Sequence, residues 1–420
     1  MTCCKQWRDF VVATVAPLFI MFAAMPALAQ TFSVLHTFTG GADGANPAAG
    51  LVMDRGGRLY GTSSAGAAGF GTVFKLAPSG SGWTFSPLYA FTGGADGATP
   101  MAALTFGPDG GLYGTTTYGG SLSLCTYVVD NGCGVVFELR PPASFPRTAF
   151  TPWGETVLYA FNNTQGAWPF GEVIFDSQGN LYGTTYTGGL HSGAGTGGGC
   201  FANACGTVYE LSPSNGSWNL SREALLSADT GSNPVSGLAM DQQGALYGVA
   251  SYTGPSGYGT LLRLTPSGSS FALDILTVFL SQEGGNVYST PVLDAVGNLY
   301  DGNPGVHGEF MGEVFSINSL GGYSSLFSFT PGDGPYGDLM MDTHGNLYGT
   351  TEVGGAHNYG SVFKLTPGNG GWMYTDLHDF QQAEGCNPLG KILVDGNGNL
   401  YGTTSRCGAN QLGSVWEITP

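Results

Sequence analysis

Charged residues are scarce in this sequence, and basic residues are the scarcest. Only 10% of the 420 residues are charged, with 12 Lys and Arg against 29 Asp and Glu, and the formal net charge is −17. A protein this acidic is repelled by phosphate backbones and by anionic lipid surfaces. The composition therefore argues against nucleic acid and against a membrane surface as partners, and leaves neutral or cationic partners open.

Long apolar runs are absent beyond the first thirty residues, so no membrane span is predicted there. At the start, the basic residues Lys5 and Arg8 precede an apolar run over 10–25, and the small-residue pattern Ala27-Leu28-Ala29 follows. This order predicts a secretory signal peptide at 1–29, with a retained membrane anchor as the alternative. No Cys stands directly after the apolar run, which argues against lipoprotein processing, and the chain ends on an expected β-strand rather than an anchor. We expect a secreted or periplasmic protein.

Catalytic signatures are also missing. The sequence has no Gly-x-Ser-x-Gly, no His-Glu-x-x-His and no Cys/His zinc spacing, and its Gly runs lack the Lys-Ser/Thr of a phosphate loop. Paired carboxylates for glycoside hydrolysis cannot be selected, because their separation is not readable from sequence. Two of the six His, His36 and His378, occupy equivalent strand positions, which favours packing over metal ligation. The sequence therefore indicates no catalytic residue and no metal ligand.

Glycine is abundant instead, with 72 residues, while 42% of the chain is hydrophobic. This balance indicates an all-β protein with many tight turns rather than disorder. The heptapeptide GNLYGTT occurs at 179–185, 345–351 and 398–404. It belongs to a longer repeat whose units share a Leu-Tyr pair, and the seven Tyr are Tyr60, Tyr113, Tyr182, Tyr247, Tyr300, Tyr348 and Tyr401.

Each unit keeps the same residues at fixed distances from its Tyr. Gly stands three positions before all seven Tyr, Asp six before in six units, and Pro thirteen before in six units. Gly107 breaks the Asp rule in unit two, and Val287 breaks the Pro rule in unit five. Asp-x-x-Gly predicts a tight turn, since Asp bonds its own backbone and Gly adopts positive φ.

Four short strands fit each unit. The apolar run before the Asp (GLVMD), NLYGTT, a run such as GTVFKL, and an aromatic run ending LYAF or LHDF predict strands A to D. Seven such units predict one domain over 30–420, a seven-bladed β-propeller with four-stranded blades. The last unit lacks strand D, and TFSVLHTF at 31–38 resembles WMYTDLHDF at 372–380. We therefore expect the N-terminal strand to complete the last blade and close the ring.

The unit D-x-x-G-N-L-Y-G-T-T-x-x-G-G followed by G-T-V-F-K-L resembles the GloVer tandem repeat of exported bacterial proteins. The best copies are residues 342–365 and 395–418, and the resemblance covers nearly the whole chain after the signal. It implies a repeat architecture and an exported location. The family has no assigned chemistry that could be carried over to named residues.

Six Cys remain after the signal, an even number that suggests three disulfides in an exported chain. In a propeller the B-to-C and D-to-A loops open on one face, and this register predicts the pairs Cys125–Cys133, Cys200–Cys205 and Cys386–Cys407. The first two pairs lie in long B-to-C loops. Tyr113 to Phe137 spans 24 residues and Tyr182 to Tyr209 spans 27, whereas the other units span 14 or 15.

These two long loops are the best functional clue, because ordered loops on rigid scaffolds commonly bind ligands. Loop drift, with the disulfides limiting proteolysis, is the alternative. The aromatic, amide and imidazole side chains in the two loops suit a carbohydrate or a protein of the cell envelope, and the expected ligand-binding residues are Tyr118, Tyr127, Asn131, Tyr186, His191, Phe201 and Asn203. The sequence thus favours a monomeric binding module over an enzyme or a purely structural surface protein.

One enzyme hypothesis stays open. Acidic residues recur in the D-to-A loops at Asp43, Asp96, Asp333 and Glu384. Their oxygens could hold Ca²⁺ and support a lactonase or lyase, although Asp-Gly turns joining strands explain them as well. No other cofactor is expected.

Overall fold

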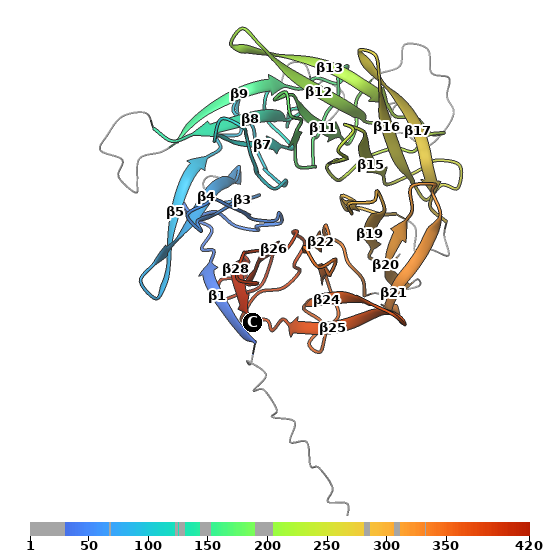
Figure 1. Ribbon diagram of the computed structural model, residues 1–420. Coiled ribbons are helices and arrows are strands. Elements are labelled where there is room, and N and C mark those ends of the chain that lie inside the picture. Colours follow the sequence, from blue (N-terminus) through green and yellow to red (C-terminus); the bar gives the residue numbers. More distant parts are fainter. Residues whose placement is uncertain are drawn as a thin grey trace, which may run out of the picture.

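The computed structural model describes residues 30–66, 69–121, 125, 131–142, 153–189, 205–280, 286–305, 311–331 and 333–420. These residues form 28 strands and no α-helix, and so they contain no helix able to cross a membrane. The strands make seven four-stranded antiparallel sheets. The sheets surround a common axis, and the seven-bladed β-propeller expected from the repeat is confirmed (Figure 1).

Each blade runs from a short inner strand to a long outer one. Blade 1 is β2 (Val52–Met53), β3 (Leu59–Ser63), β4 (Thr72–Ser79) and β5 (Gly82–Ala90). Blade 2 is β6 (Thr105–Phe106), β7 (Leu112–Thr116), β8 (Val135–Arg140) and β9 (Gly154–Ala160). Blade 3 is β10 (Ile174–Phe175), β11 (Leu181–Thr185), β12 (Thr207–Ser214) and β13 (Ser217–Leu225). Blade 4 is β14 (Ala239–Met240), β15 (Leu246–Ala250), β16 (Thr260–Ser267) and β17 (Ser270–Val278).

The remaining blades repeat this order, and the last takes its outer strand from the N-terminus. Blade 5 is β18 (Val292–Leu293), β19 (Leu299–Asn303), β20 (Met311–Ile317) and β21 (Tyr323–Pro331). Blade 6 is β22 (Met340–Met341), β23 (Leu347–Thr351), β24 (Ser361–Gly368) and β25 (Gly371–Asp379). Blade 7 is β26 (Leu393–Val394), β27 (Leu400–Thr404), β28 (Ser414–Thr419) and β1 (Thr31–Thr37).

Strand A is shorter than the sequence pattern suggests. The run GLVMD predicts about five residues, but β2 contains only Val52 and Met53. Asp54 already begins the turn to β3, where it accepts the Gly57 N–H and the Arg58 N–H. The residues before β2 leave the sheet and line the propeller axis. The equivalent strand in every other blade also has two residues.

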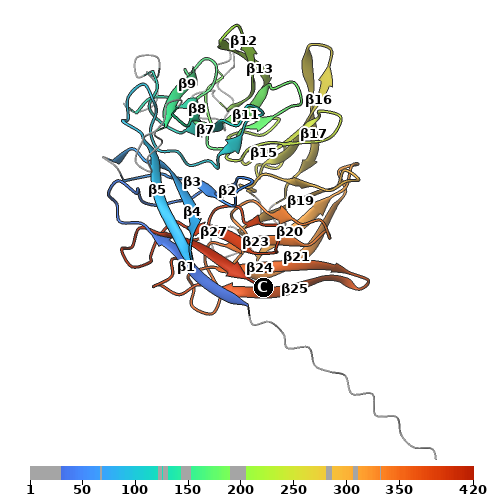
Figure 2. The same cartoon turned by 60° about the vertical axis from the view of Figure 1, so that its left-hand side comes forward.

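The ring closes through β1, as expected. β1 pairs antiparallel with β28, from Thr31 opposite Thr419 to Thr37 opposite Ser414 (Figures 1 and 2). Closure also involves the inner part of blade 7, since Thr403 Oγ1 donates a 2.8 Å hydrogen bond to the carbonyl of Ala49 in blade 1. First and last blades are thus joined both at the outer edge and near the axis.

The heptapeptide GNLYGTT is explained by these contacts between and within blades. Its Leu is buried, and its Tyr packs against the next blade. The Tyr hydroxyl donates to the turn Asp six residues earlier, as Tyr348 does to Asp342. The first Thr donates to an inner carbonyl of the next blade, as Thr350 does to Pro388. The motif is therefore architectural.

Blade 2 shows how the one missing turn Asp is replaced. Gly107 stands at the Asp position, and Asp109, two residues later, accepts the Tyr113 hydroxyl at 2.8 Å. Asp109 also accepts the Gly111 N–H. The carboxylate therefore reaches the repeat Tyr from a position two residues later in the turn. The Asp–Tyr hydrogen bond thus occurs in all seven blades.

Candidate functional site

The D-to-A and B-to-C loops of a blade pair with each other on one face of the propeller, which we call the loop-rich face. Isolated antiparallel bridges join the two loops in five blades: Ala45 with Ala65, Ala98 with Tyr118, Ala167 with Thr187, Ser232 with Tyr252, and Cys386 with Arg406. In blade 6 the D-to-A loop pairs instead with the end of β23, through Pro335 and Thr351. Each bridge ties a loop to a rigid scaffold. Side chains on this face are therefore held in fixed positions, as binding sites require.

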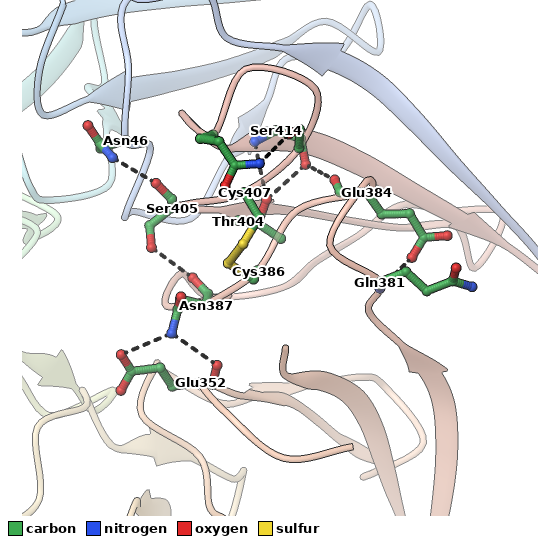
Figure 3. The surroundings of a disulfide bond; sticks show 12 residues. Asn46, Glu352, Gln381, Glu384, Cys386, Asn387, Thr404, Ser405, Cys407 and Ser414 are labelled. Carbon is green, nitrogen blue, oxygen red and sulfur yellow. Dashed lines mark hydrogen bonds between the residues drawn. A yellow bond between two sulfur atoms is a disulfide. The ribbon is translucent and has the colours of Figure 1, made fainter. Parts of the chain in front are cut away.

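A disulfide reinforces this pairing in blade 7. Cys386 and Cys407 are joined, with 5.2 Å between their Cα atoms, as the sequence register predicts. Around it, Asn46 of blade 1 donates to the Ser405 carbonyl at 3.0 Å, and Asn387 donates to the Glu352 carbonyl of blade 6 (Figure 3). Three consecutive blades are connected at this point of the face.

The longer loops carry the other disulfides. Cys125 is joined to Cys133 in the B-to-C loop of blade 2, with 5.8 Å between the Cα atoms. Cys205 is also in a disulfide, while its expected partner Cys200 lies outside the described residues. Disulfides persist in oxidising compartments, so these bonds are compatible with an extracellular or periplasmic protein.

Three of the seven expected ligand-binding residues lie in the described part of the chain. Tyr118 and Tyr186 are half-buried on the loop-rich face, and Asn131 is exposed there. Asn131 contributes its carbonyl, which accepts the Gly119 N–H at 2.6 Å. The other four, Tyr127, His191, Phe201 and Asn203, lie outside the described residues.

Tyr118 and Tyr186 belong to a larger group of aromatic side chains, which we call the aromatic arc. It consists of Tyr118, Trp168, Phe170, Tyr186, Tyr252, Tyr288 and Tyr336, and all seven are half-buried. Trp168 joins the two expected residues, with ring centroids 5.9 Å from Tyr118 and 6.3 Å from Tyr186. Phe170 lies 5.4 Å from Tyr186.

The second half of the arc comes from blades 4 to 6. The Tyr288 ring stacks on that of Tyr336 at 5.2 Å, and the Tyr252 hydroxyl donates to the Tyr288 hydroxyl at 3.2 Å. Burial raises the pKa of Tyr336 to about 12 and also raises that of Tyr252, so both phenols stay neutral at physiological pH. The arc therefore offers apolar ring faces and neutral hydroxyls together.

Trp168 is held in a left-handed backbone conformation, with φ of 60°. The equivalent positions of blades 1, 4 and 7 hold Asn46, Asn233 and Asn387 at 54–56°. Asn tolerates this region, whereas a bulky side chain is strained there by about 1–3 kcal/mol. Trp168 nevertheless fits, because its backbone N–H donates to the Cys133 carbonyl at 2.9 Å and its indole N–H donates to the Gly132 carbonyl at 3.4 Å. The disulfide loop of blade 2 thus supports the ring.

The arc borders a cavity on the propeller axis, which we call the axial cavity. Its volume is about 290 Å³. It is lined by the residues ten, eleven and twelve positions before the repeat Tyr, from all seven blades: Ala48, Ala49, Gly50, Met101, Ala102, Ala103, Phe170, Gly171, Glu172, Val235, Ser236, Gly237, Tyr288, Thr290, Tyr336, Gly337, Asp338, Leu389, Gly390 and Lys391. Phe170, Tyr288 and Tyr336 belong to both arc and cavity.

Only some blades contribute charged residues to the wall of the axial cavity. At the position ten before the Tyr, blades 1, 2 and 4 have Gly or Ala, whereas blades 3, 6 and 7 have Glu172, Asp338 and Lys391. Asp338 accepts the Thr290 N–H at 2.7 Å. Burial and the Glu172 carboxylate raise the pKa of Asp338 to about 6, against the opposing effects of Lys391 and the Thr290 hydrogen bonds. The Glu172 carboxylate also raises the pKa of Lys391, so this Lys is cationic.

Sequence reasoning missed this group because its three charged residues come from three different blades and form no motif along the chain. Counting from the repeat Tyr would have placed all three at one level of the axis. Their side chains project into a common cavity because seven equivalent segments converge there. The common spacing from the repeat Tyr was visible in the sequence, but only the propeller geometry shows that residues at this position meet in one cavity.

The acidic loop residues that the calcium hypothesis used bind groups of their own loops. Asp43 accepts the Thr39 N–H at 2.8 Å, Asp96 accepts the Thr92 N–H at 2.8 Å, and Glu384 accepts the Gln381 N–H at 2.9 Å. Asp333 accepts the Thr330 hydroxyl at 2.6 Å. Within the described ranges, no three His, Cys, Asp or Glu side chains gather as a metal site would require.

His36 and His378 pack as their equivalent positions suggest. His378 stacks on Phe32 with 3.8 Å between ring centroids, and His36 stacks on Phe85 at 4.0 Å. Each ring also contacts the acidic residue of its D-to-A loop, His36 with Asp43 at 3.2 Å and His378 with Glu384 at 3.0 Å. Both imidazoles thus fix outer strands of the propeller.

Comparison with known proteins identifies a family with the same repeat. The profile of the Gloeobacter/Verrucomicrobia repeat matches residues 21–196, 125–300 and 194–416, which together span almost the whole chain. The chain belongs to this repeat family. The GloVer resemblance read from the sequence is thereby confirmed. No curated protein shows significant similarity to the chain.

Solved structures similar to this repeat protein are other propellers at low identity. A puromycin hydrolase is similar with a TM-score of 0.55 and 12% identity, covering 88% of this chain and 53% of the hydrolase. A candidate 6-phosphogluconolactonase from Bacteroides uniformis has a TM-score of 0.50 and 14% identity, covering 85% of this chain and 94% of its own. A gluconolactonase from Xanthomonas campestris has a TM-score of 0.42 and 15% identity, covering 76% of this chain and 85% of its own. At this identity the likeness concerns the fold alone.

Proposed function

We propose that this repeat protein is an exported binding module that holds a carbohydrate against the aromatic arc of its loop-rich face. The observation that carries the proposal is the arc itself: seven half-buried aromatic side chains from five blades, beside a polar cavity. Such rings are large apolar surfaces with little conformational freedom, and the Tyr among them add a hydroxyl.

A carbohydrate fits this chemistry better than other ligand classes. Sugar rings have an apolar C–H face that an aromatic ring covers, and hydroxyls at the edge that phenols can bind. The net charge of −17 disfavours anionic ligands, including nucleic acid and acidic lipid. Aromatic side chains are equally common at protein interfaces, so a protein of the cell envelope is the other ligand class to be tested.

The contacts of the acidic loops weigh against the metal-assisted enzyme as a second proposal. The carboxylate oxygens expected to bind Ca²⁺ already accept hydrogen bonds within their own loops. These hydrogen bonds explain why the loops contain acidic residues. The fold-level similarity to lactonases and a hydrolase adds no residue to that hypothesis. We therefore test for turnover rather than propose it.

A glycan and polysaccharide screen of purified residues 30–420, with and without Ca²⁺, tests the proposal. We expect saturable binding without product, weakened about tenfold or more in Trp168→Ala and Tyr288→Ala. Trp372→Ala is the matched control, because Trp372 is also half-buried but packs against Tyr300 beside the β24–β25 turn. A silent screen would contradict the carbohydrate proposal and direct the search to envelope proteins, and release of product would show an enzyme.

A further inference from the structure

We infer that the axial cavity is a site for one end of a neutral polyhydroxylated chain, so that the protein recognises the chain end rather than its interior. The inference rests on the carbohydrate function proposed above and assigns its specificity. It comes from three features of the cavity: charged side chains without an ion pair, opposite charges facing one space, and a small volume.

Two charged side chains in the cavity wall form no ion pair. No described residue forms an ion pair with Lys391 or with Glu172. The two residues come from blades 7 and 3 and line one cavity. Charged groups away from bulk water need hydrogen-bonding partners, which a ligand or water in the cavity can supply.

The charged side chains in the cavity wall favour a ligand with no net charge. The Lys391 ammonium donates hydrogen bonds and the Glu172 carboxylate accepts them. A hydroxyl does both, so one sugar can satisfy the two groups at once. An anionic ligand would meet Lys391 favourably but Glu172 and Asp338 unfavourably, and a cationic ligand would be opposed by Lys391. A neutral polyol is therefore the ligand class that no charge in the wall repels.

The size of the cavity restricts how much of a chain enters. Its volume of about 290 Å³ lies at the lower limit of the roughly 300–1,000 Å³ pockets that hold small molecules. The wall is closed around the axis because the inner segments of neighbouring blades touch. A Cβ added to Gly337 would lie 2.1 Å from the Leu389 carbonyl oxygen, and one added to Gly390 would lie 2.5 Å from Ala49. A single sugar unit fits, with the rest of the chain left at the arc.

The cavity and the aromatic arc are built from the same chain segments. Phe170, Tyr288 and Tyr336 lie twelve residues before the repeat Tyr, and the polar residues lie one or two residues deeper along the same segments. A chain end bound by Lys391 and Glu172 would therefore continue past these three rings. The arc then contributes affinity for the following sugars, and the cavity contributes selection of the end.

The test compares linear and cyclic probes of the same sugar by isothermal titration calorimetry. The probes are maltohexaose and cyclomaltohexaose, which contain the same six glucose units with and without ends, followed by each linear glycan found in the screen with its end-blocked form. The variants are Glu172→Gln and Lys391→Met, with Lys364→Met as control. Lys364 lies over the Tyr348 ring at 5.4 Å and does not line the cavity.

We expect a linear glycan to bind, its cyclic or end-blocked form to bind at least tenfold more weakly, and both cavity variants to weaken the linear glycan about tenfold while Lys364→Met leaves it unchanged. Glu172→Gln keeps the side-chain shape, so it remains informative if Lys391→Met unfolds. Equal binding of linear and blocked forms, or cavity variants within twofold of the natural protein, would overturn end recognition and leave the carbohydrate function standing. Binding of no glycan in any form would overturn both proposals.

Discussion

The Tyr288 ring of blade 5 stacks on the Tyr336 ring of blade 6 with centroids 5.2 Å apart, and both Tyr line the axial cavity together with Asp338. Both Tyr occupy the same repeat position, twelve residues before Tyr300 and Tyr348. The repeat thus places two aromatic rings from different blades in contact at the axial cavity. A repeated architecture has here produced a local surface that no single repeat contains.

The left-handed backbone at Trp168 gives the first prediction. Trp168→Ala and Trp168→Asn should both weaken carbohydrate binding about tenfold, since both remove the ring between Tyr118 and Tyr186. The Asn variant should be more stable than the Ala variant by about 1 kcal/mol, because Asn tolerates φ near 60°. Urea unfolding of both variants measures this difference. Equal stabilities would show that the backbone there is not strained.

The disulfides give the second prediction. Replacing Cys386 and Cys407 by Ser should lower the free energy of unfolding by about 3 kcal/mol, because the bond closes a 21-residue segment. Replacing Cys125 and Cys133 should also weaken carbohydrate binding, since the carbonyls of Gly132 and Cys133 hold Trp168. Thermal unfolding and titration of the two double variants separate these effects. Unchanged binding in the Cys125 and Cys133 variant would contradict the supporting role of that loop.

The hydrogen bond that joins blades 7 and 1 gives the third prediction. Thr403→Val keeps the side-chain shape but removes the hydrogen bond to the Ala49 carbonyl, at a cost of about 1–2 kcal/mol. Blade 4 offers a natural control, because Val249 already occupies the equivalent position there and is 1% exposed. Val249→Thr in the same background should not restore the lost stability. An unchanged denaturation midpoint for Thr403→Val would show that the bond does not contribute to closure.

Asp338 gives a prediction of pH dependence. Its pKa of about 6 in the folded protein is above the usual 3.8, so between these pH values the folded state binds the proton more tightly than the unfolded chain. The stability that Asp338 contributes therefore falls as the pH rises from about 4 to about 6, and is constant above. Asp338→Asn removes this term, although Glu172 and Lys391 still face the position. The stability of the variant relative to the natural protein should thus increase from pH 4 to 7.

Asp342 is the control for this experiment because its pKa shifts the other way. Burial acts to raise the pKa of Asp342, but hydrogen bonds from Asn346 and His344 hold it below its usual value. Its contribution to stability is present near neutral pH and is lost as the pH falls through the folded-state pKa. Asp342→Asn should therefore lose stability relative to the natural protein as the pH rises. Parallel pH profiles for the two variants would contradict the assignment at Asp338.

The fold was predictable because its signal is repeated seven times. The Asp-x-x-Gly turn, the Leu-Tyr pair and the strand C pattern predict the turns and strands of each copy from its own residues. TFSVLHTF at 31–38 predicted how the ring closes. The length of strand A was not predictable, since its first residues leave the sheet to line the axis. A repeat pattern does not reveal this, because the segment is apolar in either case.

The candidate site was predictable only where it lies in unusual loops. Tyr118 and Tyr186 were found from the long B-to-C segments, while Trp168 lies in a D-to-A loop of ordinary length. Glu172, Asp338 and Lys391 are more than fifty residues apart along the chain and meet only because the ring closes. Contacts of this kind depend on blade number and curvature, which no segment contains by itself.

The most direct test of the central claim is a calorimetric titration of one glycan identified in the screen into the natural protein, the double variant Trp168→Ala/Tyr288→Ala, and the control Trp372→Ala, all checked for folding. We expect saturable binding to the natural protein and to the control, with similar affinity. We expect at least a hundredfold loss in the double variant, because one ring is removed from each half of the aromatic arc. Equal affinity in all three proteins would contradict a binding site at the arc.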